Sequence, residues 1–186
     1  KYFIQKYFAL FIGFTYLLYT IGQNIALTEK YGVSIITINI IMFLFVAYSW
    51  FVEFKEQKNK YTFGNWKIKY IWLVVLSIIA FWAPIDYSSA PMVDLHLKYF
   101  ITSGSALAFC LTTPLLLTIM TLNIPHINIF TYRITALIGF IIGIYNMMLF
   151  GHPELFWLAI MHIPLITVSF FSLINSYRVE KKYNLY

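Results

Sequence analysis

Six long apolar runs follow one another along this chain of 186 residues, and they constrain its fold more than any other feature. A helix needs about 20 apolar residues to cross the hydrocarbon core of a bilayer. The runs are apolar on every face and lack the strict alternation of a transmembrane barrel. We therefore predict an all-α, polytopic integral membrane protein that forms a single domain over residues 1–186. The predicted spans lie at about residues 7–27, 32–52, 69–84, 96–122, 133–150 and 155–176.

The amino-acid composition supports this class. Hydrophobic residues make up 61% of the chain and charged residues only 11%, whereas soluble domains carry about 25% charged residues. So few charges could not cover a water-facing surface. The net charge of +6 would suggest nucleic acid as the partner of a soluble protein. Because no basic stripe with stacking aromatic residues stands outside the apolar runs, we expect no nucleic-acid partner and take the lipid bilayer as the first partner.

The distribution of Lys and Arg predicts the orientation of the spans. If the N-terminus lies in the cytoplasm, eleven of these residues fall on the cytoplasmic side and two, Lys30 and Lys98, fall outside. An odd number of spans would break this split. The positive-inside rule therefore predicts about six spans, both termini in the cytoplasm, and a multi-pass protein of the plasma membrane. The longest polar loop, residues 53–69, is then a topology signal or a binding segment for anionic lipid head groups.

The stretch APIDYSSAPMVDLHLKYF, residues 83–100, interrupts the apolar pattern. In the predicted orientation it joins the third and fourth spans on the outer side of the membrane. Pro84 and Pro91 fix the backbone at two points and should define its turns. We expect residues 83–98 to fold back as a cap over the outer ends of the third, fourth and sixth helices.

Charged side chains form a polar rim on this outer side. Lys98 should pair with Asp94 or Asp86, because an unpaired ammonium near the hydrocarbon boundary is unfavourable. A solvent-exposed pair would only order the loop, whereas a buried pair beside a histidine would mark a functional centre. The candidate ion-pair or outer-site residues are Asp86, Asp94, Lys98 and Glu154.

In the predicted orientation, three of the four histidines also lie in the outer half of the membrane protein. His162 lies within the sixth span, roughly 10 Å below the outer surface at 1.5 Å per residue. An ionisable residue inside a span is a functional candidate. Imidazole and thioether ligands together suit copper, so we predict a copper site from His96, His152, His162 and Met92. The histidine side chains should then approach within about 4–5 Å of one another. Packing, turn formation and ion pairing explain the same residues without a metal.

The remaining motifs describe packing more than chemistry. The segment GFIIG, residues 139–143, has the Gly-x-x-x-Gly spacing of close helix contacts, within the bundle or with a partner. Pro114 inside the fourth run predicts a kink. The chain shows no Gly-x-Ser-x-Gly, His-Glu-x-x-His or phosphate-loop signature. The sequence therefore favours a role without catalysis over an enzymatic one.

The order of these features resembles a known family. A helix ends in FWAPIDYSSAP, the next begins VDLHLKYFI and runs to LTTPLLL, and WLAIMHIPL comes last. Over about residues 45–175 this order is similar to the CtaG-type cytochrome c oxidase assembly factors of Gram-positive bacteria. The resemblance implies that His96 opens the central helix, that Pro114 belongs to a proline-leucine run and that His162 is a later in-helix histidine. The family has more histidines, roughly seven spans, and a second proline at the position of Thr113.

Three functions stay open at this point. The resemblance implies an assembly or copper-handling factor for a respiratory terminal oxidase, acting at the outer face of the bacterial plasma membrane. The second is a non-catalytic membrane subunit, or a small transporter component, that docks on a larger membrane protein complex. The third is a membrane-embedded lipid-modifying enzyme, with His96 or His162 as the base beside Asp94 or Glu154.

Overall fold

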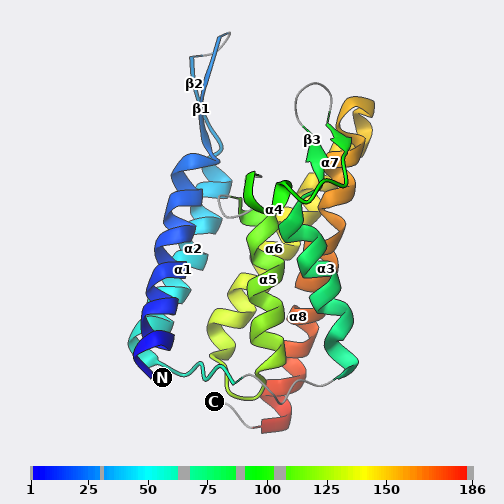
Figure 1. Cartoon of the computed structure of the whole chain (residues 1–186). Coiled ribbons are helices and arrows are strands. Elements are labelled where there is room, and N and C mark those ends of the chain that lie inside the picture. The colour runs from blue at the N-terminus through cyan, green and yellow to red at the C-terminus, as the bar shows by residue number, and fades with distance from the viewer. Residues whose placement is uncertain (1, 30–31, 63–67, 87–90, 103–107, 184–186) are drawn as a thin grey trace.

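The computed structural model describes residues 2–29, 32–62, 68–86, 91–102 and 108–183. In these residues the chain forms a bundle of helices that stand side by side, with two short strand pairs at one end (Figure 1). Both ends of the chain lie at the opposite end of the bundle from the strands (Figure 1). This arrangement separates an end that carries hairpins from an end that carries the termini.

Each predicted apolar run contains or overlaps at least one helix. The helices are α1 (Tyr2–Gly22), α2 (Thr37–Glu56), α3 (Ile71–Trp82), α4 (Tyr99–Thr102), α5 (Phe109–Leu122), α6 (Ile129–Asn146), α7 (Phe156–Met161) and α8 (Ile163–Tyr183). Short 3-10 turns flank them at η1 (Ile68–Tyr70), η3 (Met147–Gly151) and η4 (Pro153–Leu155). The strands are β1 (Ile25–Thr28), β2 (Gly32–Ile35), β3 (Ile85–Asp86) and β4 (Met92–Val93).

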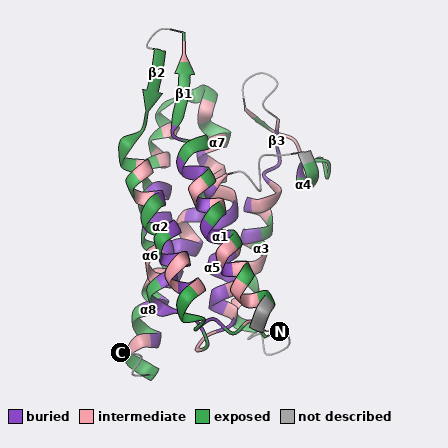
Figure 2. Ribbon diagram, turned by 90° about the vertical axis from the view of Figure 1, so that its left-hand side faces the viewer, coloured by how far each residue is buried: buried purple, intermediate pink, exposed green. Residues whose placement is uncertain are grey.

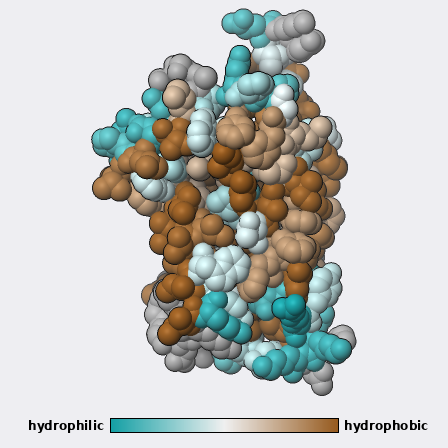
Figure 3. All heavy atoms as spheres, turned by 90° about the vertical axis from the view of Figure 1, so that its right-hand side faces the viewer, coloured by the Kyte–Doolittle hydropathy of each residue, from teal (hydrophilic) through white to brown (hydrophobic). Residues whose placement is uncertain are grey.

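Four helical segments of the described chain are long and apolar enough to cross a membrane. They are Ile4–Gly22, Thr37–Glu56, Ile129–Gly151 and Pro153–Tyr183. Two shorter apolar helices, Ile68–Trp82 and Phe109–Leu122, accompany them. The space-filling view shows a hydrophobic band between polar groups at the two ends (Figure 3). The prediction of a mostly helical chain with membrane-type helices is confirmed to this extent.

The core lies where the helices face one another. Helix α1 packs along α2, α2 against α6, and α6 along α8, while α3 and α5 pack together and against α8. Buried residues line these inward faces, and exposed residues cover much of the outer surface of the bundle (Figure 2). Trp50, Phe109, Leu117 and Tyr132 are among the largest fully buried side chains. Outward apolar side chains are what a bilayer requires of its spanning helices.

Polar bonds across the core connect α1 to α5. The Tyr16 hydroxyl lies 3.0 Å from Thr113 Oγ1, and the Tyr19 hydroxyl lies 2.8 Å from Thr112 Oγ1. All four side chains are buried. Hydrogen bonds of this kind fix the register of membrane helices, which gain little from hydrophobic burial against one another.

The Gly-x-x-x-Gly segment forms a close contact inside the bundle. A Cβ atom added at Gly139 would lie 2.5 Å from Ser169 Oγ, and one added at Gly143 would lie 2.5 Å from Ile166 Cγ1. Helices α6 and α8 approach this closely because glycine has no side chain. Of the two alternatives left open by the sequence, the structure shows the one within the bundle.

The predicted ends of the first two spans are wrong. Spans at 7–27 and 32–52 were expected, but α1 ends at Gly22 and α2 begins at Thr37. Of the described residues between them, Ile25–Thr28 and Gly32–Ile35 pair as the antiparallel strands β1 and β2. They are rich in β-branched side chains, which favour strands, and Gly32 adopts a φ of 66° next to the turn. Apolar character alone did not distinguish this hairpin from a continuing helix.

The fourth and sixth spans also differ from expectation. Within the described residues, the run at 96–122 is helical at α4 and again from Phe109 onward. The sixth helix is interrupted at His162, between α7 and α8, and then continues to Tyr183, beyond the predicted end at residue 176. A charged pair between α6 and α8, described below, accompanies this extension of α8.

Candidate functional site

Residues 83–86 and 91–98 fold back on themselves at the end of the bundle that carries the strand pairs. Strands β3 and β4 pair antiparallel, and the Asp94 backbone N–H donates to the Pro84 carbonyl at 3.0 Å. Strand β4 contacts α7, at the start of the sixth helix, and α3 contacts α4. Residues 87–90 of this expected cap lie outside the described residues.

Asp94 is the centre of the polar contacts in this cap. Its Oδ2 accepts a hydrogen bond from the Tyr99 hydroxyl at 2.8 Å and lies 3.8 Å from Lys98 Nζ. The Tyr99 hydroxyl is the donor in this bond, because a carboxylate oxygen accepts. Asp86 is partly buried on β3.

The predicted Lys98–Asp94 ion pair is confirmed, but it is exposed. The Lys98 side chain is 50% exposed and the Asp94 side chain is 39% exposed. Because α4 begins only at Tyr99, the pair spans a turn and not one face of a helix. An exposed pair contributes at most about 1 kcal/mol. By the criterion set from the sequence, this pair orders the loop and does not mark a functional centre.

His96 holds the turn before α4. Its Nδ1 accepts a hydrogen bond from the Lys98 backbone N–H at 3.0 Å, and its carbonyl accepts one from Trp82 Nε1 at 3.1 Å. The Trp82 ring also stacks on Phe100 with 5.5 Å between centroids. These contacts connect α3 to α4. Met92, on β4, has a side chain that is 59% exposed.

The other two candidate histidines lie in different environments. His162 is buried at the junction of α7 and α8, and its Nδ1 lies 2.8 Å from the Leu158 carbonyl oxygen. The buried imidazole therefore bonds within its own helical turn. His152 is exposed where η3 ends, and Glu154 is exposed in η4.

The structure does not bring His96, His152 and His162 together into one cluster. Across the described residues, no three His, Cys, Asp or Glu side chains lie close enough together to hold a metal ion. His96, His152 and His162 are all within the described chain. Copper binding through these residues and Met92 stays a prediction.

The β1–β2 hairpin presents an apolar surface beyond the ends of α1 and α2 (Figure 1). Opposite residues pair as Ile25 with Ile35 and Leu27 with Val33, so these four side chains share one face. We call Ile25, Leu27, Val33 and Ile35 the apolar hairpin face. Their side chains are between 44% and 86% exposed. The opposite face carries only small or hydroxyl-bearing residues: Ala26, Thr28, Gly32 and Ser34.

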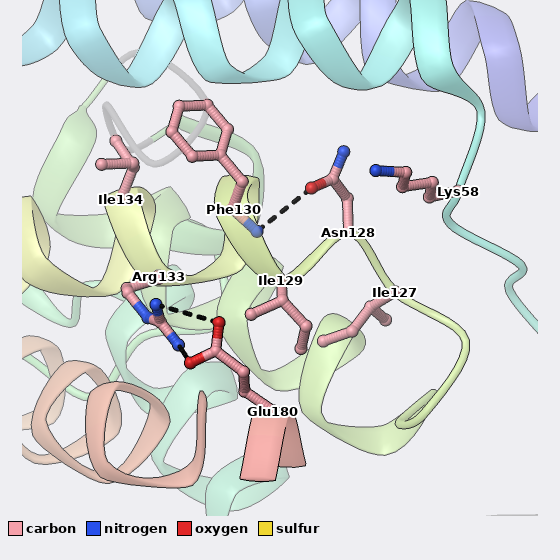
Figure 4. A pocket seen from close by; sticks show the side chains of 8 residues that line it. All are labelled: Lys58, Ile127, Asn128, Ile129, Phe130, Arg133, Ile134 and Glu180. Atoms are coloured by element: carbon pink, nitrogen blue, oxygen red, sulfur yellow. Dashed lines mark hydrogen bonds and ion pairs between the residues drawn. The ribbon is translucent and has the colours of Figure 1, made fainter. Parts of the chain in front are cut away.

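At the other end of the bundle lies a pocket that we call the inner pocket (Figure 4). It has a volume of about 360 Å³ and lies between the segment after α2, the start of α6 and the end of α8. Figure 4 shows Lys58 on one side, Arg133 with Glu180 on the other, and Ile127 and Ile129 between them. The residues that line it are Lys58, Ile127, Asn128, Ile129, Phe130, Arg133, Ile134 and Glu180.

Buried amides fix one wall of the inner pocket. The Asn59 backbone N–H donates to Glu53 Oε1 at 2.8 Å, and Asn59 Oδ1 accepts from the Asn128 backbone N–H at 2.7 Å. Asn128 Nδ2 in turn donates to Glu56 Oε2 at 2.9 Å. Asn128 Oδ1 also caps α6 by accepting from two amides of its first turn, at 3.1 and 3.3 Å. The segment after α2 is thereby attached to the start of α6.

A charged pair fixes the opposite wall. Arg133 Nη2 lies 2.7 Å from Glu180 Oε2, and Arg133 Nε donates to Ser176 Oγ at 3.2 Å. The guanidinium also lies over the Tyr177 ring, 4.2 Å from its centroid. Lys58 is less constrained: it pairs with Glu56 at 3.1 Å and its side chain is 61% exposed.

The sequence reasoning missed the inner pocket. It placed Lys58 in the loop 53–69, interpreted as a topology signal or a binding segment for anionic lipid head groups. It counted Arg133 only as a topology signal and gave no role to Asn128 or Glu180. Two signals were available. Asn128 directly precedes an apolar helical run, as an N-cap residue does, and Arg133 and Glu180 carry opposite charges near the same ends of neighbouring spans.

Comparisons with protein-family models, curated proteins and solved structures gave no match for this chain. The resemblance to the CtaG-type family therefore stays a prediction from the sequence motifs.

Proposed function

We propose that this chain is a non-catalytic subunit of the bacterial plasma membrane that docks on a larger membrane complex through the apolar hairpin face. The proposal includes six spans, with both termini in the cytoplasm and the β1–β2 hairpin outside. The observation that carries it is the exposed apolar face of Ile25, Leu27, Val33 and Ile35 beyond the ends of α1 and α2.

The charges on the first two helices bear on the occupant of this face. The ends away from the hairpin carry Lys6 on α1 and Glu53, Lys55 and Glu56 on α2, so the uncharged length of each helix is about 24 Å at 1.5 Å per residue, against a hydrocarbon thickness of about 30 Å. The apolar hairpin face then begins near the hydrocarbon boundary and extends toward the interfacial region, where a contiguous apolar face marks an interaction site.

Isolated two-stranded hairpins are marginally stable in water. Within the described chain, β1 pairs only with β2, so each strand also offers an open edge. A partner that covers the apolar face stabilises the hairpin as well as binding it. The resemblance of residues 45–175 to oxidase assembly factors makes a terminal oxidase the first complex to test.

Photo-crosslinking from the two faces of the hairpin tests this proposal. A photoreactive amino acid replaces Leu27 on the apolar face, and the matched control replaces Ser34 on the opposite face. In native membranes we expect Leu27 to crosslink to one discrete protein and Ser34 to do so far less. Equal labelling from both positions, or labelling of lipid alone from Leu27, contradicts docking through this face.

Charge placed on the same face should separate docking from folding. Leu27→Lys with Val33→Lys should remove the chain from the larger complex on native gels and leave the thermal midpoint of the purified protein unchanged. The control, Ala26→Lys with Ser34→Lys, should keep the complex.

Copper handling is a separate proposal, supported by the ligand types of His96, His152, His162 and Met92. Metal analysis of the detergent-purified protein tests it. About one equivalent of copper, lost in His162→Ala, supports the proposal. Copper at background level in protein that still assembles fully into the larger complex rejects it.

A further inference from the structure

We propose that the inner pocket binds the phosphodiester head group of an anionic phospholipid from the cytoplasmic leaflet. This site is independent of the outer hairpin, because the two lie at opposite ends of the bundle (Figure 1). It gives the inner end of the molecule a ligand of defined chemistry.

The lining of the pocket is divided between polar and apolar groups. Lys58 and Arg133 supply nitrogen donors, while Ile127 and Ile129 lie between them (Figure 4). Phosphodiester oxygens accept hydrogen bonds and carry negative charge, and the glycerol and first acyl carbons that follow them are apolar. The volume of about 360 Å³ is within the range of sites for small ligands, roughly 300–1,000 Å³.

The position of the pocket matches the location of such lipids. Eleven of the thirteen Lys and Arg residues fall on the side that the positive-inside rule assigns to the cytoplasm, and Lys58 and Arg133 belong to this group. The cytoplasmic leaflet is the one that presents anionic head groups. Basic pockets between spanning helices on that side are suited to binding them.

The two cations have different roles. Glu180, Ser176 and the Tyr177 ring hold the Arg133 guanidinium in place, and Glu180 balances its charge. Arg133 therefore contributes a fixed donor geometry and little net attraction. The Lys58 ammonium contacts Glu56 at an exposed position, so it can turn to a phosphate at small cost.

The first amides of α6 do not provide the site. Asn128 Oδ1 already accepts from two of them, at 3.1 and 3.3 Å. Recognition of the phosphodiester therefore depends on the side chains, and a substitution of Lys58 tests it. Loss of one lysine charge near an anionic surface should weaken lipid binding about fivefold.

Lipid titration of the detergent-purified protein tests the site. Phosphatidylglycerol or phosphatidylcholine is added in mixed micelles, and the rise in thermal midpoint gives the lipid concentration for half-maximal effect. Lys58→Gln is compared with the wild type and with Lys182→Gln, which removes an exposed lysine at the end of α8 that does not line the pocket. Inorganic phosphate at the same concentration forms a further arm.

We expect phosphatidylglycerol to stabilise the protein and phosphatidylcholine to have little effect. Lys58→Gln should raise the half-maximal phosphatidylglycerol concentration about fivefold, and Lys182→Gln should change it less than twofold. Equal effects of the two substitutions, or of the two lipids, overturn the proposal. Stabilisation by inorganic phosphate equal to that by phosphatidylglycerol overturns the assignment to a lipid.

Discussion

A single methyl group added at Gly139 tests how closely α6 and α8 pack. In Gly139→Ala the new Cβ atom would lie 2.5 Å from Ser169 Oγ and 3.3 Å from Thr113 Cγ2. Since Cβ contacts below 3.0 Å do not persist in folded proteins, a side chain or a helix must move. Overpacking of this kind costs about 1–3 kcal/mol, and the higher helix propensity of alanine returns up to about 1 kcal/mol. We expect a net loss of about 1–2 kcal/mol.

A double-mutant cycle assigns this loss to one contact. Within the described residues, the buried Ser169 Oγ has no hydrogen-bond partner, so Ser169→Ala alone should raise stability by about 1 kcal/mol, because it removes an unsatisfied buried hydroxyl. The same change removes the atom that the new methyl group meets. Gly139→Ala should therefore cost little in the Ser169→Ala background, which gives a coupling of about 1–2 kcal/mol.

The assay is reversible unfolding in mixed micelles, with helix content followed by circular dichroism. Gly22→Ala is the matched control, because a Cβ atom there would meet no atom within 4 Å, and it should match the wild type closely. Additive effects of the two substitutions in the cycle would refute the assigned contact. A neutral Gly139→Ala would show that Ser169 simply rotates away and that the helices are not closely packed at this point.

Three further substitutions probe the two ends and the middle of the bundle. Tyr16→Phe removes the bond to Thr113, and unfolding in mixed micelles should show a loss of about 0.6 kcal/mol, with more than about 2 kcal/mol contradicting an ordinary interhelical bond. Asn128→Ala removes the cap of α6 and should cost about 1 kcal/mol, with faster amide exchange confined to the first turn of α6; unchanged exchange there would contradict the capping role. Asp94→Asn should leave the thermal midpoint in detergent within about 2 °C of wild type, because the pair with Lys98 is exposed; a large fall would show that the pair is effectively buried.

The sequence predicted the presence of the helices well because the hydrocarbon core of a bilayer offers no hydrogen-bond partners to the backbone. Every backbone polar group in the core of a bilayer must be bonded internally, so a long apolar run has few folds open to it. The Gly139 and Gly143 spacing likewise identified a real helix contact. Beyond the end of a span this constraint relaxes. Residues 25–28 and 32–35 continue the apolar runs of the helices beside them, and their β-branched content, Gly32 and the charged residues Glu29 and Lys30 distinguish the hairpin.

The sites were harder to predict because they depend on which side chains share a space. The Lys98–Asp94 pair could be inferred from a separation of four residues, since neighbours in sequence have few alternatives. The inner pocket brings together Lys58, Asn128 and Glu180, which are far apart in the chain. Their proximity follows from the packing of α2, α6 and α8, and periodicity carries no information about it.

The orientation of the bundle underlies both proposals, docking through the hairpin and lipid binding in the inner pocket, and cysteine labelling measures this orientation directly. Glu29→Cys places a thiol beside the hairpin turn, and Thr62→Cys places one in the segment after α2, each in a background with Cys110→Ser. Intact cells are treated with a membrane-impermeant thiol reagent before and after lysis. We predict that the thiol at position 29 reacts on intact cells and the thiol at position 62 reacts only after lysis. The reverse order would place the hairpin in the cytoplasm and contradict both proposals.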